Sequence, residues 1–173
     1  MIHIAYIFII IFFSIIIQII VGTYGIIFPI TALSIIYLSV VYGWRKGIIS
    51  AIISGIIIDI LYGRTIFISP FTLIVISILA IVWLYKSNVQ NMKLQTVPGG
   101  VAALIYTLPV LVLNYSLNEQ GIYLLFINFL LLTASVLLGA FLMPIYISVL
   151  DSISKVLRIN LYTEAQEKLN REL

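Results

Sequence analysis

Long, almost uninterrupted runs of isoleucine, leucine and valine constrain this chain more than any other feature of its sequence. A helix needs about 20 mostly apolar residues to cross a bilayer, and lipid favours helices because every backbone polar group must find its partner within the segment. That length predicts spanning helices at about 3–21, 25–42, 47–62, 66–85, 98–115 and 122–149. We therefore expect an all-α integral membrane protein whose residues 1–150 form a six-transmembrane-helix bundle.

The composition also favours a bilayer as the solvent. Hydrophobic residues make up 63% of the chain, whereas only nine residues are Lys or Arg and six are Asp or Glu. A soluble domain has roughly one quarter charged residues. There is no cysteine and a single histidine, so neither a metal site nor a cofactor is expected. The basic residues lie singly or in pairs at helix ends, which indicates contact with membrane lipid and not with nucleic acid.

The basic residues also predict the orientation, because cytoplasmic loops of membrane proteins carry the excess of Lys and Arg. In the expected topology one side carries only Arg64. The other side carries the remaining eight: Arg45, Lys46, Lys86, Lys93, Lys155, Arg158, Lys168 and Arg171. We therefore expect a multi-pass protein with both termini in the cytoplasm.

The composition changes after Leu150, because residues 151–173 hold eight of the fifteen charged residues. Apolar residues recur there at steps of four, which keeps one face of a helix apolar. We expect a cytoplasmic amphipathic helix over 151–173. This helix either lies on the membrane surface or docks onto a cytoplasmic partner.

The third expected span has the sharpest pattern in the chain. Its small or polar residues fall at steps of four, at Gly47, Ala51, Gly55, Asp59 and Gly63. Positions four apart follow one slowly winding face of an α-helix. Helices in lipid associate through small residues that let their backbones approach, so this ridge should face protein. It is either a helix-packing surface or the binding site of a partner's transmembrane helix.

Asp59 is the only acidic residue inside an expected span. A charged group in hydrocarbon is costly, so it should face a partner, a cavity or water. Arg64 is the nearest conceivable counter-charge. Two interpretations stay open: Asp59 binds another subunit or an internal ligand, or it is a buried carboxylate that caps a neighbouring helix or satisfies the loop that follows.

The sequence offers no pair of groups for catalysis, which needs at least two cooperating side chains held within reach of each other. An intramembrane aspartyl protease would lack its second carboxylate, since only Asp59 lies in an expected span. No Gly-rich phosphate loop opens a soluble helix. We therefore expect a protein that is not an enzyme.

The stretch from the second to the fourth span resembles the family of the bacterial rod shape-determining protein MreD. In that family a proline early in the second span precedes a glycine-spaced helix ending in G-x-x-x-D-x-x-x-G. The matching residues here are Pro29, Gly47, Gly55, Asp59 and Gly63, and the ending around Pro144 is also similar.

The resemblance implies a non-enzymatic scaffold or regulatory subunit of the complex that synthesises side-wall peptidoglycan during cell elongation and so controls rod shape. It implies an MreC-like partner and, more widely, MreB, RodA and its transpeptidase, at the bacterial inner (cytoplasmic) membrane. It also implies a fold similar to the substrate-binding membrane subunits of energy-coupling-factor transporters.

Two other functions stay open. The first is the substrate-binding membrane subunit of a vitamin importer, which would need a preformed pocket with several convergent polar groups. The second is a transporter or flippase with Asp59 and Arg64 lining a groove. It is disfavoured because the middle of most spans is uninterrupted Ile, Leu and Val.

Overall fold

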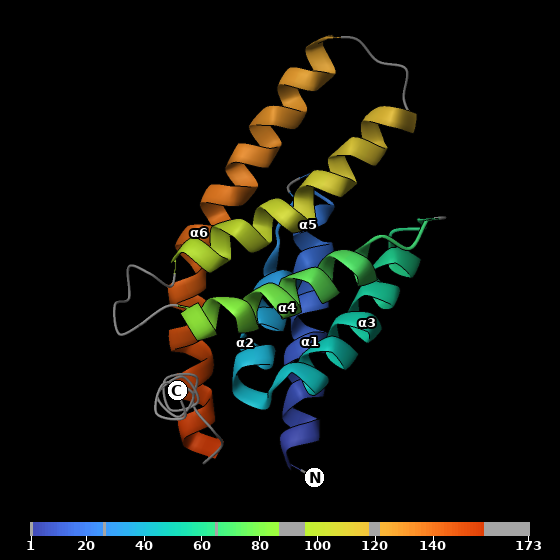
Figure 1. Cartoon of the computed structure of the whole chain (residues 1–173). Helices are drawn as coiled ribbons and strands as arrows, with labels where there is room; N and C mark the ends of the chain where they lie inside the picture. Colours follow the sequence, from blue (N-terminus) through green and yellow to red (C-terminus); the bar gives the residue numbers. More distant parts are fainter. Residues whose placement is uncertain (1, 26, 65, 87–95, 118–121, 158–173) are drawn as a thin grey trace.

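The computed structural model describes residues 2–25, 27–64, 66–86, 96–117 and 122–157 (Figure 1). Over these ranges the chain is all-helical, with six helices: α1 (Ile2–Gly22), α2 (Ile30–Tyr42), α3 (Trp44–Leu61), α4 (Ser69–Lys86), α5 (Thr96–Leu117) and α6 (Ile122–Leu157). Three helical stretches are long and apolar enough to cross a membrane, namely His3–Gly22, Thr96–Leu113 and Leu125–Val156.

Helix α2 begins later than the sequence predicts. We expected a span over 25–42, but the helix covers only Ile30–Tyr42, which is 13 residues. Gly25 adopts a positive φ of 76°. Pro29 directly precedes the helix, and its carbonyl oxygen accepts a hydrogen bond from the Leu33 backbone N–H. Thirteen residues span about 20 Å, which is shorter than the roughly 30 Å hydrocarbon layer.

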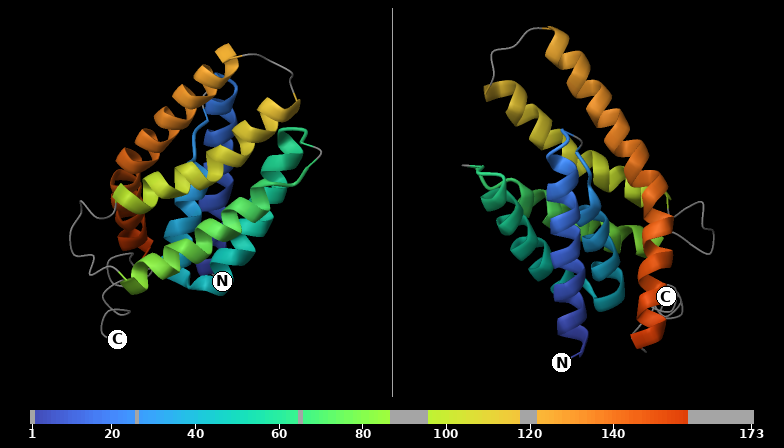
Figure 2. Two further views of the ribbon diagram at one scale, coloured as in Figure 1. Left: turned by 45° about the horizontal axis from the view of Figure 1, so that its top comes forward. Right: turned by 180° about the vertical axis from the view of Figure 1, so that it is seen from behind.

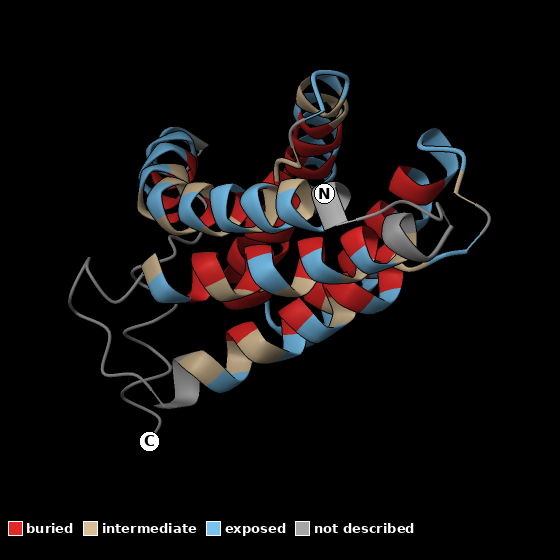
Figure 3. Ribbon diagram, turned by 90° about the horizontal axis from the view of Figure 1, so that it is seen from above, coloured by how far each residue is buried: buried red, intermediate tan, exposed pale blue. Residues whose placement is uncertain are grey.

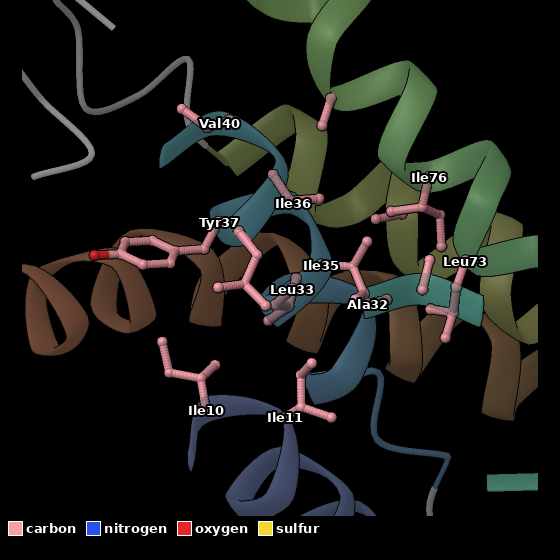
Figure 4. Packing of buried hydrophobic residues seen from close by; sticks show 14 of the residues in the cluster. Ile10, Ile11, Ala32, Leu33, Ile35, Ile36, Tyr37, Val40, Leu73 and Ile76 are labelled. Carbon is pink, nitrogen blue, oxygen red and sulfur yellow. The ribbon is translucent and has the colours of Figure 1, made fainter. Parts of the chain in front are cut away.

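This short helix lies at the centre of the molecule. Every residue from Ile30 to Val41 is buried, because other helices surround α2. Figure 4 shows its side chains between α1, which contributes Ile10 and Ile11, and α4, which contributes Leu73 and Ile76. The view from above shows buried positions on inner faces and exposed positions on outer ones (Figure 3). A helix that is apolar on all sides is expected in such a central position.

Helix α6 is longer than the expected span 122–149. It continues without a break through Leu150 to Leu157, a total of 36 residues. The boundary that we expected between residues 150 and 151 therefore lies inside a helix. The physical reason is that Asp151 and Ser154, three residues apart on one face, are buried against the bundle and have partners there. The rest of the expected amphipathic tail, 158–173, lies outside the described residues.

Helices α5 and α6 form a close antiparallel pair whose far end extends beyond the other helices (Figure 2). Small residues let the two backbones approach: a Cβ added to Gly139 would lie 2.6 Å from the Ala103 Cβ and 2.7 Å from the Gly99 carbonyl oxygen. The hydroxyls of Thr107 and Ser135 lie 2.8 Å apart across the same contact. This pair uses the small-residue packing that we expected only on α3.

Candidate functional site

The ridge of α3 faces inward. Gly47, Ala51, Gly55 and Asp59 are all buried, together with their neighbours Ser50 and Ser54. The isoleucines on the outer faces of this helix are exposed, by 48% at Ile53 and 62% at Ile60. The step of four therefore marks the inner face of α3.

The chain's own helices cover this ridge. A Cβ added to Gly47 would lie 2.9 Å from both Cα and Cβ of Ser39 in α2. A Cβ added to Gly55 would lie 2.5 Å from the Pro70 Cα and 2.8 Å from the Ser69 carbonyl carbon in α4. Of the two uses that the sequence left open for the ridge, these contacts correspond to helix packing. A partner's helix would first have to displace α2 and α4.

Gly63 is not part of this surface. It is exposed and follows the end of α3 with φ +63°. Its backbone N–H donates to Ile60 O, and the Arg64 N–H donates to Asp59 O over 2.9 Å, which is the Schellman arrangement that ends a helix. We expected Gly63 as the fifth member of the ridge. It ends the helix instead, because glycine adopts a positive φ without steric cost.

Asp59 is fully buried and joins the end of α3 to the start of α4. Its Oδ2 accepts the backbone N–H of Ser69 over 2.8 Å, and its Oδ1 accepts the Ser69 hydroxyl over 2.6 Å. The Arg64 guanidinium lies 3.0 Å from the same Oδ1. Ser69 is the first residue of α4, so Asp59 acts as a cap for a neighbouring helix and Arg64 is its counter-charge.

Polar contacts continue from this carboxylate across the molecule. Ser69 interacts with the hydroxyl of Tyr106 on α5, and that hydroxyl accepts a bond of 2.5 Å from the Gln18 Nε2 on α1. The Gln18 Oε1 accepts the backbone N–H of Thr31 at the start of α2. One network thus ties the ends of α1, α2, α3 and α4 to the middle of α5, because buried polar groups need partners.

A second polar cluster lies around the end of α6. The Tyr37 hydroxyl donates to Asp151 Oδ1 over 3.1 Å and lies 3.1 Å from the Ser154 hydroxyl. The Tyr6 hydroxyl lies 2.8 Å from the same serine. We expected Asp59 to be the only carboxylate within the helical bundle. Asp151 is a second one, missed because a charged residue after an apolar run normally indicates the end of a span.

The two clusters lie at opposite ends of the molecule. Tyr62 contacts the C-terminal part of α1, where its hydroxyl donates to Gln18 O, and His3 contacts Tyr42 at the other end with ring centroids 5.9 Å apart. Lys46 lies over the ring of the same Tyr42, and Lys155 follows Ser154, which contacts Tyr6, so Arg45, Lys46 and Lys155 lie at the end near His3. Arg64 lies over the Tyr62 ring and therefore at the end near Gln18. Lys86, Lys93 and the basic residues beyond 157 are not among the described side chains.

The surface carries an apolar groove between α1 and α3, with a volume of about 730 Å³. On α1 the lining residues run from Ile4 to Ile19, and on α3 from Lys46 to Leu61. Fifteen residues of helix correspond to about 22 Å, so the groove extends along most of a hydrocarbon layer. Its walls are almost entirely isoleucine and phenylalanine, with Lys46 at one end.

Comparisons with known proteins do not place the chain in a family. No family model matches it, and neither a curated protein nor a solved structure is significantly similar. The assignment of a function therefore depends on the residues themselves: the pattern around Asp59, the two polar clusters and the hollows of the surface.

Proposed function

We propose that this protein is a non-enzymatic membrane scaffold or regulatory subunit of the bacterial cell-elongation complex, similar to MreD. It would cross the inner membrane six times with both termini in the cytoplasm, in a fold similar to the substrate-binding subunits of energy-coupling-factor transporters. The pattern Gly47, Gly55, Asp59 and Gly63 supports this proposal, because each of these residues has a specific structural task. Gly47 and Gly55 pack against α2 and α4, Asp59 caps α4, and Gly63 ends α3.

The outer surface and the charges support the membrane location. Large apolar side chains are exposed on the five helices around α2, for example Phe8, Ile60, Phe71, Val112 and Phe141. A soluble monomer rarely exposes so much contiguous apolar surface, whereas lipid is a suitable solvent for it. The described basic residues also divide as the positive-inside rule expects, with Arg45, Lys46 and Lys155 at one end and Arg64 at the other.

The groove between α1 and α3 is the docking surface that supports a scaffold function best. Its occupant in this proposal is one apolar transmembrane helix of an MreC-like protein. The groove is about as long as such a helix needs, and its walls are apolar. Lys46 at its end would favour a partner helix that carries an acidic residue at that end.

Copurification tests this proposal. The tagged full-length protein would be extracted from its own membranes in a mild detergent, and the proteins bound to it would be identified by mass spectrometry. The variant Ile53→Trp fills the groove, whereas Leu137→Trp adds the same side chain to an exposed position of α6 outside it. We expect an MreC-like protein or elongation enzymes with the wild type and Leu137→Trp, and much less with Ile53→Trp.

The same experiment can overturn the proposal. Equal recovery of the partner with Ile53→Trp would remove the groove as its binding site. Recovery of paired ATPases with a transmembrane coupling subunit would replace the scaffold function with the alternative, a substrate-binding subunit of a vitamin importer.

A further inference from the structure

A polar pocket opens at the Arg64 end of the molecule, where α1, α3, α5 and α6 meet. Its volume is about 370 Å³, within the range of small-molecule sites. The polar side chains in its wall come from three helices and from the loop after α3: Gln18, Tyr62, Arg64, Tyr106 and Asn128. The remaining wall is largely apolar, with Phe28 and Leu131 among its members.

The pocket presents hydrogen-bond donors that the described part of the chain does not use. Arg64 bonds Asp59 and Ser69 through Nη1 alone, and a guanidinium has five N–H groups. The amide of Asn128 has no hydrogen bond within the described residues, although it lies in the wall. No described acidic side chain lines the pocket, and Asp59 is fully buried behind Arg64. This arrangement favours a ligand with an anionic, acceptor-rich group.

An apolar cleft continues from the polar pocket. It lies between α5 and α6, has a volume of about 270 Å³ and shares Leu111 and Asn128 with the pocket. Its other lining residues are apolar. Two of them, Val112 and Phe129, lie on the outer surface, where they are 57% and 64% exposed. The cleft therefore leads from the polar pocket to the outer surface of the helices.

We propose that the pocket and the cleft together bind an anionic amphiphile. Its head group accepts hydrogen bonds from Arg64 and Asn128, and one hydrocarbon chain lies in the cleft between α5 and α6. A fatty acid and an anionic phospholipid share this chemistry. The inference depends on the membrane location proposed above but goes beyond the scaffold function, since it needs no protein partner.

The polar network gives this site a fixed base. Tyr62 and Gln18 are joined by a bond of 3.1 Å, and Gln18 is in turn bonded to Tyr106. Asp59 holds Arg64 through its Nη1, so the rest of the guanidinium keeps a defined direction. Binding to groups that are already ordered loses little side-chain entropy.

Displacement of a fluorescent fatty acid tests the proposal. The full-length protein in nanodiscs of phosphatidylcholine would be loaded with 11-(dansylamino)undecanoic acid. The competitors are dodecanoate, dodecanol, dodecyltrimethylammonium, acetate and phosphatidylglycerol. We expect dodecanoate to compete at least tenfold better than the neutral, cationic and short analogues, because only it combines an anionic head with a chain. Competition by phosphatidylglycerol at lower concentration than dodecanoate would identify a phospholipid as the source of the head group.

Two variants locate the site. Asn128→Leu removes one donor and should weaken binding about tenfold, the loss for one hydrogen bond to a charged group. Thr133→Val, which alters an exposed polar residue of α6 outside both cavities, is its control. Val112→Trp blocks the cleft and should also weaken binding at least tenfold, with Leu137→Trp as its control.

Three results would overturn the proposal: no displacement by either anionic amphiphile, equal displacement by dodecanol and dodecyltrimethylammonium, or unchanged binding in both Asn128→Leu and Val112→Trp. The copurification experiment does not depend on this outcome, so failure of the ligand site and failure of the scaffold function can be told apart.

Discussion

Replacement of Asp59 tests the role of the buried carboxylate most directly. In the wild type this side chain accepts the Ser69 N–H, the Ser69 hydroxyl and one Arg64 N–H. Asp59→Ala removes all three acceptor contacts at a fully buried position. Asp59→Asn keeps the shape and one acceptor oxygen, so it serves as the matched variant that loses mainly the charge.

The magnitude follows from the exposure of each donor. Ser69 is fully buried, so its backbone N–H loses its acceptor in Asp59→Ala, and an unsatisfied buried donor costs about 1–3 kcal/mol. The Arg64 side chain is 23% exposed and can turn toward solvent, so its lost ion pair adds only about 1 kcal/mol. We expect Asp59→Ala to lower the free energy of unfolding by about 2–4 kcal/mol. Asp59→Asn should lower it by about 1–2 kcal/mol, because the Ser69 N–H keeps an acceptor.

Unfolding by increasing mole fractions of SDS in mixed micelles, followed by far-ultraviolet circular dichroism, would measure both changes. Arg64→Gln removes the counter-charge but leaves both hydrogen bonds between Ser69 and Asp59, so it should be less destabilising than Asp59→Ala. A free energy of unfolding for Asp59→Ala within about 0.5 kcal/mol of the wild type would refute the cap, since surface substitutions have effects of that size.

Three glycine substitutions test the packing. Gly55→Leu should prevent folding or lower the free energy of unfolding by more than the 1–3 kcal/mol usual for overpacking, because the neighbouring atoms are backbone atoms of α4. Unfolding in SDS measures this loss. Gly139→Leu should separate α5 from α6, which a disulfide cross-linking assay between cysteines introduced on the two helices would detect as a lower yield. Gly63→Ala should cost about 1 kcal/mol in the same SDS titration, since its φ of +63° strains any residue with a Cβ.

The sequence predicted the helices because their apolar runs are long. The described part of the chain is all-helical, and the bounds of α1 and α5 lie within about two residues of the expected spans. The length of an apolar run is a property of one segment, so a helix can be predicted from it without knowing which other helices that segment contacts. The predicted start of α2 was wrong by five residues. Hydropathy alone treats residues 25–42 as one continuous apolar run, whereas the turn and the proline before Ile30 keep the first five of these residues out of the helix.

The partners of the buried polar groups could not be predicted in the same way. The step of four on α3 correctly indicated a face that avoids the exterior, but it does not reveal whether α4 or another protein covers that face. Ser69 carried no signal of its own, and Gln18 and Tyr106 meet although 88 residues separate them. Asp151 resembled the first residue of a tail, because Tyr37, whose hydroxyl bonds it, lies on α2, 114 residues earlier in the chain.

Polar contacts have a particular importance in a bundle whose exterior is as apolar as its interior. Burial of Ile or Leu distinguishes poorly between the inside of such a bundle and lipid, so close packing and hydrogen bonds must select the arrangement of helices. The two carboxylates provide such selection at separate places. Asp59 fixes α4 on α3, and Asp151 fixes the end of α6 against α2.

The separation of these two clusters predicts that they act independently. Tyr6 contacts the Asp151 cluster and Gln18 belongs to the Asp59 network. These two residues are twelve positions apart on α1, which corresponds to about 18 Å. The changes in the free energy of unfolding caused by substitutions at sites more than about 10 Å apart are additive to within roughly 0.5 kcal/mol. The double variant Asp59→Asn, Asp151→Asn should therefore lose the sum of the two single losses in an SDS titration. A coupling above about 1 kcal/mol would mean that a helix shared by both clusters, α1 or α2, transmits a change from one cluster to the other.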